Sequence, residues 1–274
     1  MTNKFTAVDP ALLMTIRAHQ PVVLNLSNIV TVNEVANALS AIGASPIMSC
    51  APEETADLLT IADAVVLNLG TWTPAQVTHM EALGQAANTD HVPVIVDPVA
   101  VGLPKRRQVF DHLMAMVQPT VIRGNTGEIA SLAGLTAVTR GIDAANQNGL
   151  STTIETAKAV AAQYRCCVVA TGPIDVITDG DHVVINRAGT PLFATHVGSG
   201  DLLSSVLGAF LAVSDQPLTA IATGTALLGA IGAWTVTHHQ LTERQPGTFG
   251  IRLLDALCGV TANDLAPFIQ LGED

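Results

Sequence analysis

The chain has 274 residues, of which 49% are hydrophobic and only 13% charged, so it can bury a large core and lacks the composition of a disordered protein. Its formal net charge is −11 and its densest basic run is short, at 105–107, which argues against nucleic acid or an anionic membrane as a partner. No signal peptide is evident, and the longest apolar segment, 218–234, is interrupted by threonines and glycines. These features predict a cytoplasmic protein that does not enter membranes.

The cysteines do not form a recognisable site. They fall outside any CxxC or Cys/His metal spacing, and they are too few in a chain of this length to form a disulfide framework. We therefore predict reduced core residues at Cys50, Cys166, Cys167 and Cys258.

In the first half of the chain, short apolar runs alternate with amphipathic segments. Strands are predicted at 21–27, 45–48, 62–70 and 92–99, and helices at 33–43 and 73–88, the first of them ending at Gly43 as a C-terminal cap. The run at 92–99 is rich in β-branched residues, as expected for a strand buried on both faces. This alternation predicts strands that cross over through helices into a parallel sheet.

The second half continues the pattern and then changes it. A helix at 105–117 precedes a strand at 119–125, a helix that begins near Thr126, a long helix at 153–164 and a strand at 166–172. The segments 175–180 and 182–187 have the spacing of a β-hairpin, and most of the remainder is helical. The prediction is a single α/β domain, 1–274, with a mainly parallel sheet and an antiparallel edge.

The stretch "THVGSGDLLSSVLGAF" at 195–210 has the most distinctive chemistry. The amides of Gly198, Ser199 and Gly200 can point into one concavity, and a helix that starts near Asp201 adds its positive dipole end. This arrangement predicts an anion hole with a carboxylate beside it. The structural alternative is that Asp201 only caps the helix.

Three other turns fall at the carboxyl ends of predicted strands, where ligands bind in parallel α/β sheets. In "RGNTGE", Asn125 and Glu128 are one helical turn apart. They could hold hydrated Mg²⁺, or they could simply cap the helix. Arg123, at the end of the preceding strand, suggests a phosphate contact. Asp97 is either in the second shell of that metal or initiates a turn before proline. Thr171 suits a nucleotide phosphate.

Two stretches suggest an organic substrate. After the first strand, "LSNIVTVN" places Asn28 among apolar neighbours, and "GASPIMS" contributes Met48, whose soft side chain adapts to a ligand but is equally at home in a core.

With these motifs identified, nearly the whole chain resembles the hydroxyethylthiazole kinase family, a branch of the ribokinase-like superfamily. The segments that carry the resemblance include "SNIVTVNEVAN", "IGASPIMS", "VPVIVDPVAVG", "IRGNTGEIASLAG", "VVATGPIDVITDG", "GSGDLLSSVLGAF" and "QPGTFGIRLLDAL". The resemblance implies a three-layer αβα sandwich. It also implies that the protein phosphorylates the primary hydroxyl of 4-methyl-5-(2-hydroxyethyl)thiazole with MgATP, in a salvage step of thiamine biosynthesis.

Residue by residue, the resemblance implies a division of the site. Met48, Asn28 and Gly198 would contact the thiazole alcohol, Arg123, Thr171 and Asn125 the ATP, and Glu128 and Asp97 would lie near Mg²⁺. Asp201 would be the catalytic base, supported by the turn formed by Gly198, Ser199 and Gly200. Members of the family form trimers with active sites between subunits, so a homotrimer is expected.

Three positions depart from the family pattern. Asp201 stands where many members have cysteine. This departure favours catalysis, because an acid at this position is usual in ribokinase-like kinases. Val197 stands in place of a common threonine, and Leu24 in place of a common histidine. The alternatives are another ATP-dependent enzyme on this scaffold, such as an aminopyrimidine kinase or a hydrated-nicotinamide-nucleotide dehydratase, or a catalytically silent nucleotide-binding protein.

Overall fold

The computed structural model describes residues 8–135 and 147–273. These residues form a nine-stranded sheet in the order β2-β1-β3-β4-β5-β6-β7-β8-β9. The strands are β1 (Val22–Leu26), β2 (Ser45–Met48), β3 (Ala64–Asn68), β4 (Val94–Asp97), β5 (Val121–Asn125), β6 (Cys167–Thr171), β7 (Asp175–Thr178), β8 (Val183–Asn186) and β9 (Leu271–Glu273). Strands β1 to β6 pair in parallel and β7 to β9 antiparallel, which confirms the predicted sheet and its hairpin edge.

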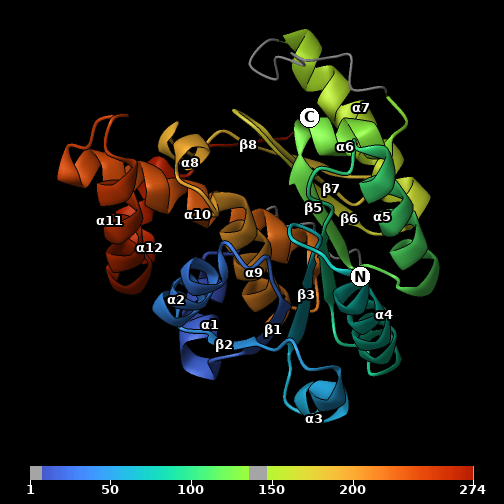
Figure 1. Cartoon of the computed structure of the whole chain (residues 1–274). Coiled ribbons are helices and arrows are strands. Elements are labelled where there is room, and N and C mark those ends of the chain that lie inside the picture. The colour runs from blue at the N-terminus through green and yellow to red at the C-terminus, as the bar shows by residue number, and fades with distance from the viewer. Residues whose placement is uncertain (1–7, 136–146, 274) are drawn as a thin grey trace, which may run out of the picture.

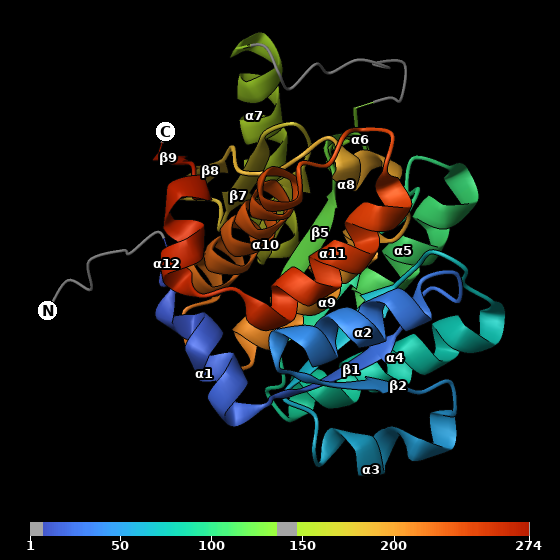
Figure 2. The same cartoon turned by 90° about the vertical axis from the view of Figure 1, so that its left-hand side faces the viewer.

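Helices form a layer on each face of this sheet (Figure 1). The first layer contains α4 (Pro74–Thr89), α5 (Pro104–Met116), α6 (Thr126–Leu132) and α7 (Gln147–Tyr164). The second, which faces the viewer in Figure 2, contains α1 (Ala11–His19), α2 (Val32–Ile42), α9 (Ser199–Leu211), α10 (Pro217–His239) and α11 (Pro246–Gly259). The remaining helical elements are short: η1 (Pro52–Glu54), α3 (Thr55–Leu59), α8 (Leu192–Thr195), α12 (Ala262–Leu265) and η2 (Ala266–Phe268).

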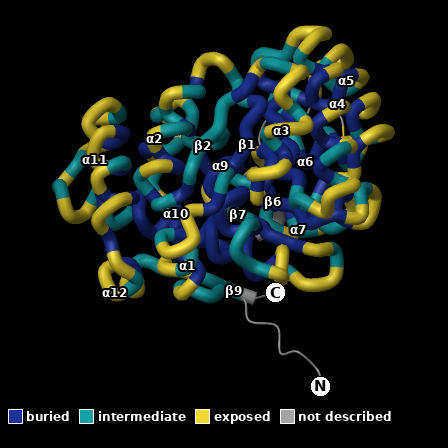
Figure 3. Tube along the Cα trace, turned by 90° about the horizontal axis from the view of Figure 1, so that it is seen from below, coloured by how far each residue is buried: buried dark blue, intermediate teal, exposed yellow. Residues whose placement is uncertain are grey.

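The central strands are buried on both faces because alternate residues serve the two layers. In β3, Ala64 and Val66 pack into the cluster on the α9 side, whereas Val65 and Leu67 pack into the cluster on the α4 side. Burial along the chain in Figure 3 follows the same plan, with the central strands dark, the edge strand β2 intermediate and much of the outer helices exposed. This explains the continuous apolar runs in the sequence.

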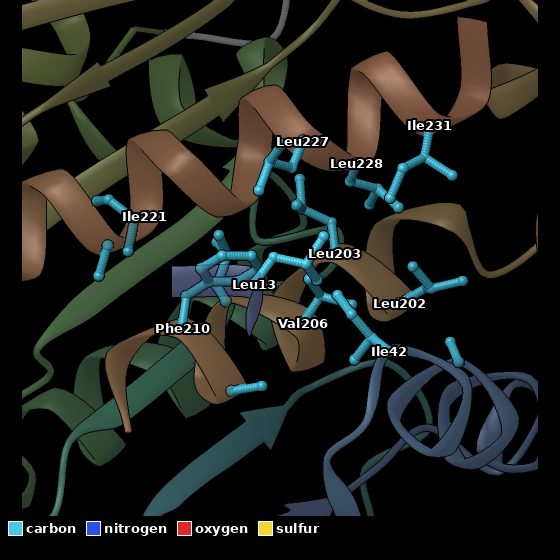
Figure 4. Packing of buried hydrophobic residues seen from close by; sticks show 14 of the residues in the cluster. Leu13, Ile42, Leu202, Leu203, Val206, Phe210, Ile221, Leu227, Leu228 and Ile231 are labelled. Carbon is cyan, nitrogen blue, oxygen red and sulfur yellow. The ribbon is translucent and has the colours of Figure 1, made fainter. Parts of the chain in front are cut away.

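Helices α9 and α10 form the centre of the second layer. Leu203, Val206 and Phe210 from α9 lie against Ile221 and Leu227 from α10 (Figure 4). α10 is long and apolar enough to cross a membrane, but 83% of its apolar window is buried inside the protein, as in the core helix of a globular domain.

Several local predictions are confirmed. Gly43 ends α2 with a φ of 101°, and α6 begins at Thr126. The prediction of core positions for Cys50 and Cys258 was wrong, since both are exposed. The segment after 187 is mostly helical, as predicted, and it also contributes the strand β9. β9 is only three residues long and pairs with β8 alone, so its pattern is too short to be distinctive.

Candidate active site

The register of the sheet brings polar residues together at the carboxyl ends of the parallel strands. Asn68, the last residue of β3, is paired with Asp97 at the end of β4, and Asn125 of β5 is paired with Thr171 of β6. Strand order reverses between β1 and β3, since the chain passes from β1 outward to β2 and then back across β1. Ligands in open α/β sheets bind at such a switch point.

The turn before α9 differs in detail from the prediction. The helix begins at Ser199 rather than near Asp201, so Gly200 lies in its first turn, and Gly198 alone of the two glycines has a left-handed backbone, with a φ of 93°. A Cβ on Gly200 would stand 2.5 Å from Arg123 Nη1. Gly198 therefore serves the turn, whereas Gly200 makes room for a guanidinium group.

The carboxylate of Asp201 accepts hydrogen bonds from side chains outside its own helix. Thr31 Oγ1 and Asn28 Nδ2 donate to Oδ2 at 2.5 and 3.3 Å. Asn68 Nδ2 donates to Oδ1 at 3.0 Å. Asp201 is therefore tied to the loop after β1 and to the end of β3, which are the two sides of the switch point, and helix capping alone does not account for it.

Arg123 connects the ends of three neighbouring strands. Its Nη1 donates to Asp97 Oδ2 at 3.2 Å and its Nη2 donates to Thr171 Oγ1 at 2.7 Å. The side chain is nearly buried, and its Nε has no hydrogen-bond partner within the described structure. A buried donor without a partner is costly, and an anionic oxygen would satisfy it.

Asp97 lies below Arg123 and is almost completely buried. Ser204 Oγ donates to its Oδ2 at 2.7 Å. Burial raises the pKa of Asp97 to about 6; Arg123 and Ser204 oppose that rise, and the carboxylates of Glu128 and Asp201 add to it. The predicted turn-initiating role therefore does not describe Asp97, which binds Arg123 and α9 instead.

Asn125 and Glu128 form the capping box that was the structural alternative for this motif. Asn125 Oδ1 accepts a hydrogen bond from Glu128 N, and Glu128 Oε2 accepts one from Asn125 N. Glu128 Oε1 accepts a third from Ala100 N at 2.8 Å. The cap is thus observed, and a metal role for Glu128 would use the lone pairs that these bonds leave free.

The local charge suits a divalent cation. The carboxylates of Asp97, Glu128 and Asp201 interact, and Arg123 is the cation that opposes them. Within the described residues, no group of three His, Cys, Asp or Glu side chains is placed to hold a metal by itself. Mg²⁺ keeps several waters and needs only one or two carboxylates beside substrate phosphates, so the donor set fits it.

A cavity of about 640 Å³ opens next to this cluster. Its lining includes the three residues predicted to bind ATP, Arg123, Asn125 and Thr171, together with Ser199 and Gly200. The lining also includes apolar or small residues: Ala188, Pro191, Phe193, Leu203, Leu228 and Gly229. A nucleotide requires both anion-binding groups and apolar surface, and this lining contains both.

Asp175 shapes one wall of the cavity. Its Oδ1 accepts a hydrogen bond from Gly172 N at 3.0 Å, and its Oδ2 accepts one from Asn186 Nδ2 at 2.9 Å. Burial raises the pKa of this acid to about 6, against these two hydrogen bonds. Asp175 therefore holds the turn after β6 against the β7–β8 hairpin.

The residues predicted for the thiazole alcohol lie on the other side of Asp201, outside the lining of this cavity. Asn28 contacts Asp201, and Gly198 lies against Thr31, where a Cβ would be 2.9 Å from Thr31 Cγ2. Met48 ends β2 opposite Asn25 and packs against the core, as the structural alternative for it proposed.

Sequence reasoning missed four polar contributors to the site: Thr31, Asn68, Asp175 and Ser204. Each follows or interrupts an apolar run, which is a weak signal, because its importance depends on which strand or helix lies beside it. Asn68 within "VVLNLG" was the easiest to find, since an amide at the end of a fully buried strand needs a partner.

The fold and this site together define a ribokinase-like kinase, a phosphotransferase class whose members appear among the structural neighbours. The chain belongs to the hydroxyethylthiazole kinase family, whose model matches residues 13–263. A protein named hydroxyethylthiazole kinase from Lactiplantibacillus plantarum is 49% identical over 255 residues, covering 93% of this chain and 96% of that protein. Another from Levilactobacillus brevis is 46% identical over 252 residues, with 92% and 95% covered.

Solved structures agree. A hydroxyethylthiazole kinase protein from Pyrococcus horikoshii OT3 superposes with a TM-score of 0.87 at 28% identity, covering 97% of this chain and 98% of that one. The ADP/ATP-dependent NAD(P)H-hydrate dehydratase of Bacillus subtilis, co-crystallized with ATP/Mg²⁺, superposes with a TM-score of 0.55 at 20% identity, covering 92% and 100%. The second likeness shows the fold alone.

Proposed function

We propose that this chain transfers the γ-phosphoryl group of ATP to the primary hydroxyl of 4-methyl-5-(2-hydroxyethyl)thiazole, a salvage step of thiamine biosynthesis. The observation that carries the proposal is the position of Asp201. Its carboxylate lies at the switch point between β1 and β3, one residue beyond Gly200, which lines the nucleotide-sized cavity. Family membership supplies the acceptor.

Phosphoryl transfer needs mainly positioning and charge neutralisation. In this proposal Asp201 accepts the proton of the acceptor hydroxyl and aligns its oxygen with the γ-phosphorus. Arg123, held by Asp97 and Thr171, lines the cavity and binds phosphate oxygens there with its guanidinium group. Main-chain N–H groups at the start of α9 stabilise the charge that develops on the transferred group.

The proposal includes Mg²⁺ near Glu128 and Asp97. When bound there it would neutralise phosphate charge and orient the triphosphate. Asn125 lines the cavity, and its main-chain N–H donates a hydrogen bond to Glu128 Oε2. A cytoplasmic location is part of the proposal, since both ATP and free thiols are maintained there.

A homotrimer with sites between subunits is also proposed. Three large apolar side chains beside Asp201 are exposed in the single chain: Ile29 (68%), Val30 (68%) and Val197 (73%). Light scattering should give three times the chain mass of 28.3 kDa, and Val30→Asp should lower it. A wild-type monomer at assay concentration would contradict this part.

The activity is tested by incubating the purified protein with MgATP and the thiazole alcohol and identifying the phosphorylated product by mass. Asp201→Asn should lower kcat by about 10²- to 10⁴-fold and change the KM for ATP little, because the base acts only on the acceptor. Asp255→Asn, at an exposed acid on α11, is the matched control. An unchanged kcat in Asp201→Asn would refute the assigned role.

The acceptor is tested separately with a panel that contains an aminopyrimidine alcohol, pyridoxal and a hydrated nicotinamide nucleotide, each followed by ADP release. Fastest turnover is expected with the thiazole alcohol. Faster turnover of another compound would redirect the proposal to that substrate, and nucleotide binding without turnover of any compound would identify a silent nucleotide-binding protein.

A further inference from the structure

Three side chains from two segments, the loop after β1 and the end of β3, donate hydrogen bonds to Asp201, and they leave its two oxygens unequal. Among residues 8–135 and 147–273, Oδ2 accepts from Thr31 and Asn28, whereas Oδ1 accepts from Asn68 only. An ionised carboxylate has about four acceptor directions, two on each oxygen. One direction on Oδ1 therefore remains.

The amide groups in this arrangement have fixed orientations. Asn68 Oδ1 accepts a hydrogen bond from Gly70 N at 2.8 Å, and Asn28 Oδ1 accepts one from Val30 N at 3.0 Å. Because each amide oxygen is held by a main-chain N–H, the NH₂ group of each must face Asp201. Rotation of either amide would place two donors together and lose both bonds.

Thr31 contacts Asp201 with the hydroxyl that would otherwise cap helix α2. It is the N-cap residue of α2, a position where threonine usually caps the helix with its hydroxyl, yet its side chain makes no cap hydrogen bond. Its hydroxyl contacts Asp201 Oδ2 instead, and the side chain is only 4% exposed. The cap interaction is given up in favour of the contact with Asp201.

Space for the cluster depends on Gly70. A Cβ there would lie 2.5 Å from Asn28 Nδ2 and 2.8 Å from Asn68 Oδ1. Such distances exclude any side chain without movement of both amides. Gly70 therefore leaves room for the amides of both Asn28 and Asn68 beside Asp201.

We propose that Thr31 and Asn68 are positioning residues, which hold the Asp201 carboxylate so that the free acceptor direction on Oδ1 receives the substrate hydroxyl. This rests on the proposed function. The alcohol O–H bond breaks and its proton binds Oδ1. The electron pair of the alcohol oxygen forms the new P–O bond, and the bond from γ-phosphorus to the β–γ bridging oxygen breaks to release ADP. Asp201 then loses the proton to water.

The experiment uses Thr31→Val and Asn68→Leu, which remove the donor at similar volume, in the full-length protein. Each should lower kcat about 10- to 100-fold, less than loss of the base itself, with the KM for ATP changed by less than about twofold. Thr31→Ser keeps the hydroxyl and should restore kcat. Thr235→Val is the matched control, because this buried threonine donates only within α10.

A double-mutant cycle separates positioning from a structural defect. In the Asp201→Asn background, Thr31→Val and Asn68→Leu should lower kcat no further, because they act through the missing carboxylate. A further loss in that background, or wild-type kcat in both single variants, overturns the assignment. If Asn68→Leu does not fold, Thr31→Val with its Ser rescue decides alone. Absence of turnover in the wild-type protein instead overturns the proposed function.

Discussion

Gly200→Ala tests whether the second glycine of the turn exists to admit Arg123. The new Cβ would lie 2.5 Å from Arg123 Nη1 and 3.1 Å from Nη2. Normal contact requires about 3.5 Å, so the guanidinium must move by roughly 1 Å. Its hydrogen bond to Asp97 is already 3.2 Å long and would break.

The magnitude follows from the contacts that are lost. A hydrogen bond to a charged group contributes about 1.5–3 kcal/mol, which corresponds to roughly a 10- to 150-fold weaker affinity for ATP. Stability should change much less, because alanine is favoured over glycine inside a helix by about 1 kcal/mol. The variant should therefore be folded but poor at binding nucleotide.

Isothermal titration with ATP and the KM for ATP measure the effect. Gly247→Ala is the matched control, since Gly247 is also the second residue of a helix and its Cβ would meet no atom within 4 Å. In an Arg123→Ala background, Gly200→Ala should have no further effect on ATP affinity. Wild-type ATP affinity in Gly200→Ala would refute the reasoning.

Three further predictions concern the rest of the molecule. Burial raises the pKa of Asp175 from its ordinary 3.8 to about 6, so the folded protein resists its ionisation. The free energy of unfolding should therefore fall by up to about 3 kcal/mol as pH rises from 4 to 6. Urea titrations across this pH range should show that fall in the wild-type protein and not in Asp175→Asn. Gly84→Ala places a Cβ 2.5 Å from Val117 Cγ2 and should destabilise the protein by about 1–3 kcal/mol in urea while kcat is unchanged; equal stability would contradict the tight packing. Ellman's reagent should titrate two thiols in the native protein, Cys50 and Cys258, and four after unfolding; four fast thiols in the native protein would show that the buried pair is accessible.

The strands and their order of appearance could be predicted from the sequence because burial on both faces leaves continuous apolar runs. The hairpin at 175–187 and the end of α2 at Gly43 were predictable for a similar reason, since turn and cap chemistry is local. The wrong start of α9 was a local error too: Gly200 resembles a turn residue until Arg123 is seen above it.

The site was only partly predictable because its residues meet through the strand order. Asp201 and Arg123 stand out in their own segments, whereas Thr171 taken alone is a weak signal, and the structure brings Arg123 and Thr171 together. The roles of Asn68 and Thr31 become visible only when β1 and β3 are known to lie side by side. The spacing of Asn125 and Glu128 was compatible with a helix cap and with a magnesium site. The structure shows the cap, and the metal contact stays a prediction.

The order of the sheet also determines what a partial chain would expose. After β3, each new strand pairs with the strand made just before it, so the sheet can extend as the ribosome delivers it. The face of β1, β3 and β4 that α9 covers must wait until residue 211 has been made. A polypeptide that ends before α9 would leave this apolar face of the sheet exposed to solvent, and we expect it to aggregate or to bind chaperones.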